Sequence, residues 1–154
     1  MKAPNEYAFD CWLDLLAVPH KYEALQPDIA RAIRYQPDFW LPDSPAWLEI
    51  KRQHHEPTAG EARVARALVG ADGHPVYIAA GWPHSDKLEL WAYHPSGAYQ
   101  HGRGYLALIW LARLVNRPMP EVRQASAEVE RRHYEFVKAW QESQKEGNYA
   151  KNDG

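Results

Sequence analysis

The sequence predicts an α/β domain in which helices flank a central mixed β-sheet and a long helix ends the chain. Two short apolar runs around a turn rich in Pro, Asp and Ser predict a β-hairpin over residues 39–51. A helical pattern at 58–69 then leads into the β-branched run 76–80, which indicates a crossover between parallel strands. Apolar periodicity over 105–115 and 121–145 predicts two further helices.

The segment before the hairpin predicts a helix and then a short strand. We expect the helix over residues 5–18, with Asn5 as its cap and Pro19 ending it. A strand is expected at 20–24. The pattern of residues 26–33 fits either a short helical turn or an extended connection, and it does not choose between them.

The second strand of the hairpin combines a hydrophobic face with a charged one. Its alternation puts Glu49 and Lys51 on one face together with Trp47, and Leu48 and Ile50 on the other. The first strand begins beside a third charged residue, aspartate 38. Two carboxylates and an ammonium group are poorly suited to a hydrophobic core, but they suit a metal site with a charged side chain beside it.

The second half of the chain is predicted from capping and turn signals. Thr58 and Glu61 form a capping box that opens the helix, so Glu61 has a structural role available. A strand is expected at 88–93 and a loop at 95–104. We expect a single domain over residues 1–146 and a flexible tail over 147–154.

Composition excludes some classes of protein. A length of 154 residues with 45% hydrophobic content fits one globular domain. A net charge of −2 and a pI of about 6.4 argue against a protein that coats nucleic acid by bulk electrostatics. We expect no membrane span and no signal peptide, because the first residues are acidic. The single Cys11 excludes an internal disulfide, so we expect a cytoplasmic protein.

The stretch from Tyr35 to Lys51 reads Tyr-x-Pro-Asp-Phe-x-Leu-Pro, a short turn, and Trp-x-Glu-x-Lys. It resembles the signature of the PD-(D/E)XK nuclease superfamily, and within it small proteins often associated with phages or actinobacteria. The resemblance covers residues 4–81, about half of the chain. It implies a restriction-endonuclease-like fold and a magnesium-dependent endonuclease that acts on DNA.

The resemblance also implies the roles of particular residues. Asp38, Glu49 and Lys51 would be catalytic, joined by Glu6 from the first helix. Asp38, Glu49 and the Ile50 carbonyl would hold Mg²⁺, for which Mn²⁺ can substitute; such cations prefer oxygen ligands. Lys51 would orient the attacking water or stabilise the developing charge.

Each of these residues also has an ordinary structural explanation. Asp38 fits a turn aspartate after proline, and Glu49 with Lys51 fits an ion pair on a solvated sheet face. Glu6 fits a solvated acid in the first turn of a helix. The Arg-Ser pair that usually precedes the family's glutamate is missing here.

Other charged residues give weaker signals. Arg52, Arg63 and Arg66 are candidates for contacts with DNA phosphates, although exposed arginines on a helix are usually only solvated. The run His54-His55-Glu56 lacks the spacing of a zinc protease helix. The histidines 94 and 101 have no cysteine partner for a zinc site, and His133 fits a core or interface position.

Three hypotheses of function remain open at this point. The first is metal-dependent hydrolysis of phosphodiester bonds in DNA. The second is a non-catalytic module on the same fold that binds nucleic acid or protein, which the acidic pI and the missing Arg-Ser pair favour. The third is a structural accessory protein that forms a homodimer through the helix at 121–145.

Overall fold

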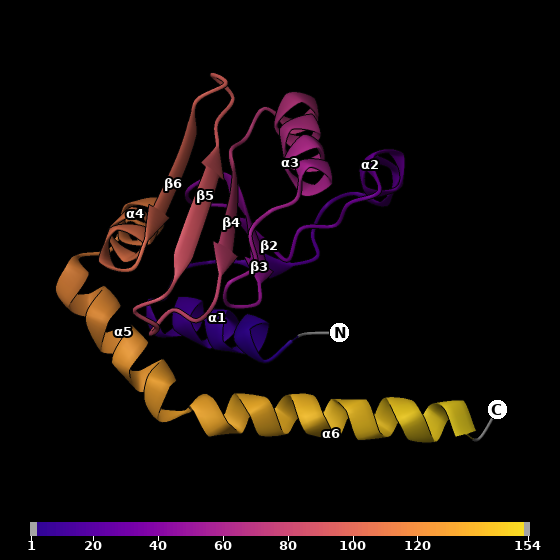
Figure 1. The fold of residues 1–154 in the computed structure, drawn as a ribbon, viewed down its shortest axis with the longest axis vertical. Coiled ribbons are helices and arrows are strands. Elements are labelled where there is room, and N and C mark those ends of the chain that lie inside the picture. The colour runs from indigo at the N-terminus through magenta and orange to yellow at the C-terminus, as the bar shows by residue number, and fades with distance from the viewer. Residues whose placement is uncertain (1–2, 153–154) are drawn as a thin grey trace.

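A computed structural model describes residues 3–152 of the chain, with side chains described for residues 3–147. Its centre is one six-stranded sheet in which the strands lie in sequence order (Figure 1). Only β3 and β4 pair in parallel, and the other four pairings are antiparallel. The strands are β1 (Lys21–Tyr22), β2 (Phe39–Leu41), β3 (Ala46–Lys51), β4 (Val76–Ala80), β5 (Glu89–Tyr93) and β6 (Tyr99–Arg103).

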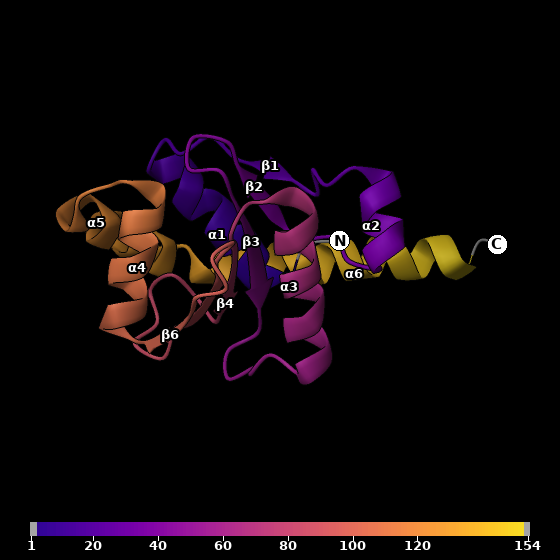
Figure 2. The same ribbon diagram turned by 90° about the horizontal axis from the view of Figure 1, so that it is seen from above.

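Helices cover both faces of the sheet (Figures 1 and 2). One hydrophobic cluster packs α1, α4 and α5 against one face, and a second packs α2 and α3 against the other. This layered arrangement confirms the predicted α/β class with a mixed sheet. The helices are α1 (Pro4–Leu15), α2 (Pro27–Ile33), α3 (Ala59–Asp72), α4 (Tyr105–Val115), α5 (Met119–Arg131) and α6 (His133–Asn152).

The predicted hairpin and crossover are both present. β2 and β3 pair in antiparallel register, with Phe39 opposite Leu48, and α3 connects β3 to its parallel neighbour β4. The alternation in β3 is also as expected: Leu48 and Ile50 belong to the cluster around α1, whereas Trp47 belongs to the cluster around α3. Glu49 therefore lies on the α3 side of the sheet.

The first helix begins and ends differently from the prediction. It runs from Pro4 to Leu15, and its N-cap is Ala3, which makes no side-chain cap. The prediction of Asn5 as the cap was wrong, because proline occupies the first helical turn and Asn5 turns inward. The Asn5 amide donates to the carbonyls of Lys51 at 2.6 Å and Gly81 at 3.2 Å, which ties α1 to the ends of β3 and β4.

The other face of α1 and its C-terminal end contact α5 and the residues just before it. The buried Trp12 indole donates to the Ser126 hydroxyl of α5 at 3.2 Å. The Arg117 guanidinium, before α5, donates to the carbonyls of Leu16 and Ala17 at 2.8 and 3.0 Å. It thereby satisfies carbonyls that the end of α1 leaves without helical partners.

Two connecting segments form regular structure. Residues 26–33, which the pattern left open, form the helix α2. The prediction of a loop over 95–104 was wrong, because residues 99–103 form β6 and pair with β5 along their length. β6 is an exposed edge strand with a polar sequence, so it lacks the hydrophobic alternation that marks a half-buried strand.

The prediction of one long helix over 121–145 was also wrong. The helix breaks at Arg132 into α5 and α6, and no proline or glycine stands at the break. There the His133 ring packs on Trp82, with ring centroids 4.2 Å apart. Helix α6 then extends past the sheet beside α1 and continues beyond Gly147 to Asn152 (Figure 1). Residues 153–154, part of the expected flexible tail, lie outside the described residues.

Within the described part of the chain, no helix combines the length and the apolar character that crossing a membrane requires.

Candidate functional site

The candidate site lies where the parallel strands β3 and β4 end. Asp38 stands at the start of β2, and Glu49 and Lys51 lie in the last half of β3. Asp38 is 7% exposed and Glu49 is 6% exposed, so both carboxyl groups are buried. In sheets with parallel strands, the carboxyl ends of the strands are the usual place for ligands.

The pairing of Phe39 with Leu48 puts Asp38 opposite Glu49, and Glu49 acts on Asp38 through a side-chain hydrogen bond and its charge. Asp38 Oδ2 also accepts a hydrogen bond of 2.7 Å from the Ile50 backbone N–H, which fixes its orientation. Burial, followed by the hydrogen bond and charge of Glu49, raises the pKa of Asp38 well above its ordinary value. The Ile50 N–H and the Lys51 ammonium only partly oppose that shift.

Lys51 lies between the buried acids and a third carboxylate. Its Nζ is 3.1 Å from Oε2 of Glu61, and it is also influenced by the charges of Glu49 and Asp38. Burial acts to lower the pKa of Lys51, but Glu49 and Glu61 outweigh burial and raise it. The lysine therefore stays protonated and is held in place beside the acids.

Glu61 is positioned by the start of α3. It completes the predicted capping box with Thr58, whose hydroxyl accepts from the Glu61 N–H at 3.1 Å. Its carboxylate also contacts His55 Nε2 at 2.8 Å. Although burial acts to raise it, hydrogen bonds with His55 and Lys51 lower the pKa of Glu61 to about 2. Glu61 thus has the structural role that the sequence predicted and a second role as the partner of Lys51.

Glu6 approaches the same site from the first turn of α1. The Tyr22 hydroxyl in β1 donates to Glu6 Oε2 at 3.0 Å. Burial and the nearby charge of Asp38 raise the pKa of Glu6 to about 6. Because the charge of Asp38 acts on Glu6, α1 contributes a fourth acid, after Asp38, Glu49 and Glu61, to the candidate site.

Tyr35 adds a polar group that the sequence did not single out beyond its place in the motif. Its hydroxyl is buried and has no hydrogen bond of regular geometry to the described residues. Burial and the charge of Glu49 raise the pKa of Tyr35 well above its ordinary value. A buried hydroxyl near two carboxylates remains able to donate a hydrogen bond to whatever occupies the site.

The side chains present fit a hard divalent cation. Asp38 and Glu49 provide carboxylate oxygens in a buried position, where two negative charges are costly without a cation. The buried Tyr35 hydroxyl, on which Glu49 acts, adds a further polar group beside the acids. The contribution of the Ile50 carbonyl stays a prediction, since the contact shown for Ile50 is through its N–H.

The predicted DNA-binding arginines lie around α3. Arg52 and Arg63 are exposed, Arg52 directly after Lys51 and Arg63 in the first turns of α3. Arg66 is exposed too, but its guanidinium lies over the Tyr93 ring, 5.3 Å from the ring centroid. A role for these arginines on DNA stays a prediction.

The histidines of the weaker motifs have ordinary partners. His94 contacts Gln100, and His101 stacks on Trp91 and contacts Glu89 at 2.9 Å. His133 packs on Trp82, as a core or interface histidine would. His55 is the exception, because its contact with Glu61 places it next to the candidate site.

Sequence reasoning missed the residues that surround the core motif. Tyr22 and His55 reach the site through contacts with Glu6 and Glu61, and Asn5 clamps the backbone at Lys51. A tyrosine in a short strand or a histidine in a loop carries no periodic signal. Asn5 and Lys51 lie 46 residues apart, so their contact depends on the complete fold.

A surface hollow of about 830 Å³ lies elsewhere, between the end of α1 and α5. Its charged lining residues are Arg117, Glu121, Glu128 and Arg131. Glu128 binds Arg131 and Arg132, so its charge is already balanced. We place the candidate site at the acids, because a hollow without converging reactive groups offers no chemistry.

Comparison with known proteins adds no assignment. The chain matches no protein-family model, and no curated protein shows significant similarity to it.

Proposed function

We propose that the protein is a metal-dependent nuclease that hydrolyses phosphodiester bonds in DNA. Asp38 and Glu49 bind Mg²⁺ or Mn²⁺, and Lys51 acts on the attacking water or on the phosphate. The restriction-endonuclease-like fold and a cytoplasmic location belong to the same proposal.

The observation that carries this proposal is the buried pair of acids with a lysine beside it. Asp38 and Glu49 are buried and stand opposite each other on neighbouring strands, and Lys51 lies within their electrostatic influence. Burying two acids together is unfavourable unless the arrangement serves a ligand. Perturbed pKa values of this kind gather at functional sites, which supports a catalytic role over a simple surface ion pair.

Each residue has a distinct task in the proposed reaction. When bound, a divalent cation polarises the phosphate and lowers the pKa of a bound water. The Ile50 N–H holds the Asp38 carboxylate in one orientation. Glu61 holds the Lys51 ammonium, which keeps it charged and aimed at the site. Glu6, with a pKa raised to about 6, is suited to exchange a proton near neutral pH.

The surface around the acids supports a nucleic-acid substrate. Arg52 and Arg63 are exposed close to Lys51 in the chain and at the start of α3, where their guanidinium groups can contact phosphates. The net charge of −2 means that such contacts are local. The proposal therefore places DNA along α3 and the end of β3.

The first prediction tests Lys51. The Lys51→Ala protein should lose cleavage of plasmid or branched DNA in Mg²⁺ and Mn²⁺. Without the Lys51 ammonium group, nothing orients the attacking water or stabilises the developing charge. It should keep metal binding, measured as thermal stabilisation by Ca²⁺, because the acids remain. Asp38→Ala should lose both properties. The measurement is a gel assay of DNA cleavage beside a thermal scan of each protein.

Lys87→Ala serves as the matched control, since Lys87 is an exposed lysine in the β4–β5 connection. It should cleave like the wild type. A wild-type protein that binds DNA but leaves every substrate intact in both metals would contradict the nuclease proposal and leave a binding module.

One observation favours that second candidate. Lys51 is held by Glu61 at 3.1 Å, and Glu61 has its own place in the capping box. A lysine held by a structural carboxylate could serve a site that binds nucleic acid or protein without cutting it. The cleavage assay separates the two functions, because a binding module would cleave DNA neither as the wild type nor as Lys51→Ala.

A further inference from the structure

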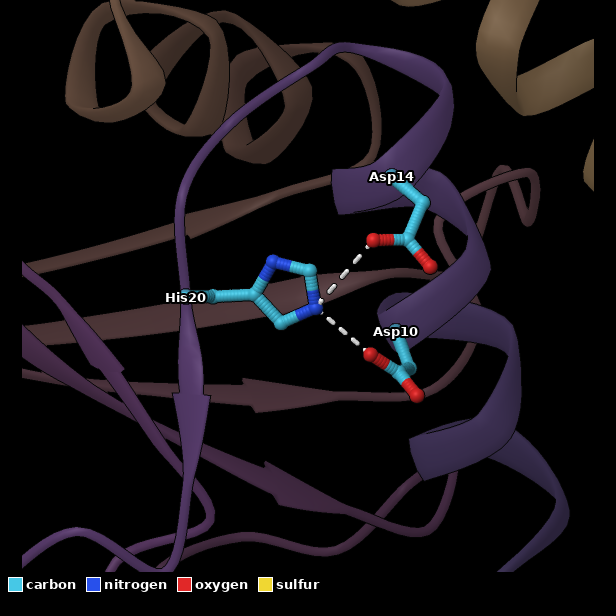
Figure 3. A group of neighbouring side chains, drawn as sticks. All are labelled: Asp10, Asp14 and His20. Atoms are coloured by element: carbon cyan, nitrogen blue, oxygen red, sulfur yellow. Dashed lines mark hydrogen bonds and ion pairs between the residues drawn. The ribbon is translucent and has the colours of Figure 1, made fainter.

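A second group of ligand-type side chains lies on α1, away from the buried acids. Asp10 and Asp14 stand one helical turn apart and both face His20, which precedes β1 (Figure 3). His20 Nε2 lies 2.5 Å from Asp10 Oδ1 and 3.6 Å from Asp14 Oδ1. One ligand atom from each of the three residues falls within 4.8 Å of the others.

A contact outside this group fixes the histidine ring. His20 Nδ1 lies 2.8 Å from the Val18 carbonyl, which can only accept, so Nδ1 carries a hydrogen. The ring also packs edge-on against Phe39, and the side chain is 10% exposed. Nε2 is therefore turned toward the two carboxylates. Metal-binding histidines commonly have this arrangement, with the second nitrogen bound to a carbonyl.

An ion pair between a protonated His20 and Asp10 is the simpler explanation, and it leaves Asp14 unexplained. One carboxylate is enough to pair with an imidazolium. A second carboxylate on the same side of the helix adds repulsion between like charges four residues apart. A divalent cation among the three side chains would be neutralised by both acids.

We propose that Asp10, Asp14 and His20 bind a divalent transition metal such as Zn²⁺. An imidazole nitrogen favours Zn²⁺ and its neighbours over Mg²⁺, which prefers oxygen ligands throughout. Asp14 is 73% exposed, so the metal would face solvent and complete its coordination with water. The site is independent of the proposed nuclease activity and does not rest on it.

The metal would join two elements that carry part of the candidate site. The same helix, α1, bears Glu6, and the strand after His20 bears Tyr22, which donates to Glu6. A cation bound between Asp10, Asp14 and His20 would clamp the helix to the strand. Its role would be to stabilise the fold near Glu6.

The test is a Zn²⁺ titration against a competing fluorescent chelator, in an Asp38→Asn background that removes the proposed magnesium site. We expect this protein to bind one Zn²⁺ and to melt at a higher temperature with it. Adding His20→Gln or Asp14→Asn should weaken binding by at least about tenfold. X-ray absorption of the zinc-bound form should show one imidazole nitrogen among oxygen ligands.

His101→Gln in the same background is the matched control. His101 also contacts a carboxylate, that of Glu89, but the same carboxylate binds Arg103 and no second acid is grouped with them among the described residues. This variant should bind Zn²⁺ like its parent. If His20→Gln does not fold, the Asp14→Asn variant still tests the proposal, because Asp14 is exposed and its substitution should not disturb the fold. Absence of Zn²⁺ binding by the parent, or equal binding by parent and variants, would overturn the proposal in favour of the ion pair.

Discussion

Asp38 and Glu49 are both buried, so their carboxyl groups have little contact with water. With no cation there, the folded protein keeps Asp38 protonated to a higher pH than the unfolded chain does. Glu6 behaves in the same way, because burial and Asp38 raise its pKa to about 6. Folding without metal therefore takes up protons at the candidate site.

The second prediction follows from the sign of that shift. An acid whose pKa is raised on folding stabilises the folded state at low pH, and its contribution is lost as pH rises from about 4.5 through about 6. In chelator, the free energy of unfolding of the wild type should fall between these two pH values, and that of Glu6→Gln should fall by about 1 kcal/mol less. This size allows for solvent screening of a half-buried group. Urea denaturation at pH 4.5 and 7.5 measures the free energy of unfolding of both proteins. The same pH dependence of stability in wild type and variant would contradict the prediction.

The core of the site could be predicted from sequence because it depends on local geometry. Period-two alternation in β3 put Glu49 and Lys51 on one face, and the hairpin turn brought Asp38 beside them. The contact of Lys51 with Glu61 could not be predicted in this way. It depends on how α3 packs over the sheet, which capping signals do not determine.

Elements with strong local signals were predicted well, and elements defined by their neighbours were not. The hairpin, the crossover through α3 and the helix α4 each carry periodicity and turn residues. Strand β6 exists because β5 offers a paired edge and α4 covers it. The break between α5 and α6 follows contacts such as that of His133 with Trp82, which no local pattern encodes.

The third prediction tests how α4 covers β6. A Cβ added at Gly102 would lie 2.6 Å from the Trp110 ring of α4, a distance that forces the ring to move. Gly102→Ala should destabilise the protein by roughly 1–3 kcal/mol through overpacking. Gly70→Ala, inside α3 with nothing near its added Cβ, should instead stabilise it by roughly 0.5–1 kcal/mol. Thermal or urea denaturation compares them, and two equal changes would mean that α4 does not press on β6.

At the scale of the whole molecule, α1 connects the site to the rest of the chain. Its N-terminal turn brings Asn5 and Glu6 to the ends of β3 and β4. Its opposite side packs on α5, where Trp12 meets Ser126, and α6 lies along it. A cation bound at the acids, as proposed, would therefore stabilise the domain as a unit and not a single loop.

The fourth prediction measures that coupling. At about 100 times its dissociation constant, a cation that binds only the folded state adds roughly 2.7 kcal/mol of stability. The melting temperature should then rise by roughly 5–10 °C in Mg²⁺, Mn²⁺ or Ca²⁺. Asp38→Asn should melt higher than the wild type in chelator, because the folded protein no longer has to protonate an acid beside Glu49, and it should respond little to the cation.

The exposed turn residue Asp43 provides the control for this experiment. Asp43→Asn should behave like the wild type with and without metal. Identical melting curves for wild type and Asp38→Asn in every buffer would mean that the acids do not form a metal site, and a structural role of Lys51 as the partner of the surrounding carboxylates would be the better explanation.

The hydrogen bond between Trp12 and Ser126 joins residues 114 positions apart. During synthesis it cannot form until the ribosome has made α5. A ribosome adds about 5–20 residues per second, so Trp12 waits roughly 6–23 s before its partner is made. Throughout that time the apolar side of the first helix, with Phe9 and Leu13, lacks the covering of α5. A nascent chain arrested before α5 should therefore be bound by chaperones that recognise exposed hydrophobic helices, and release should follow once residue 131 has left the exit tunnel.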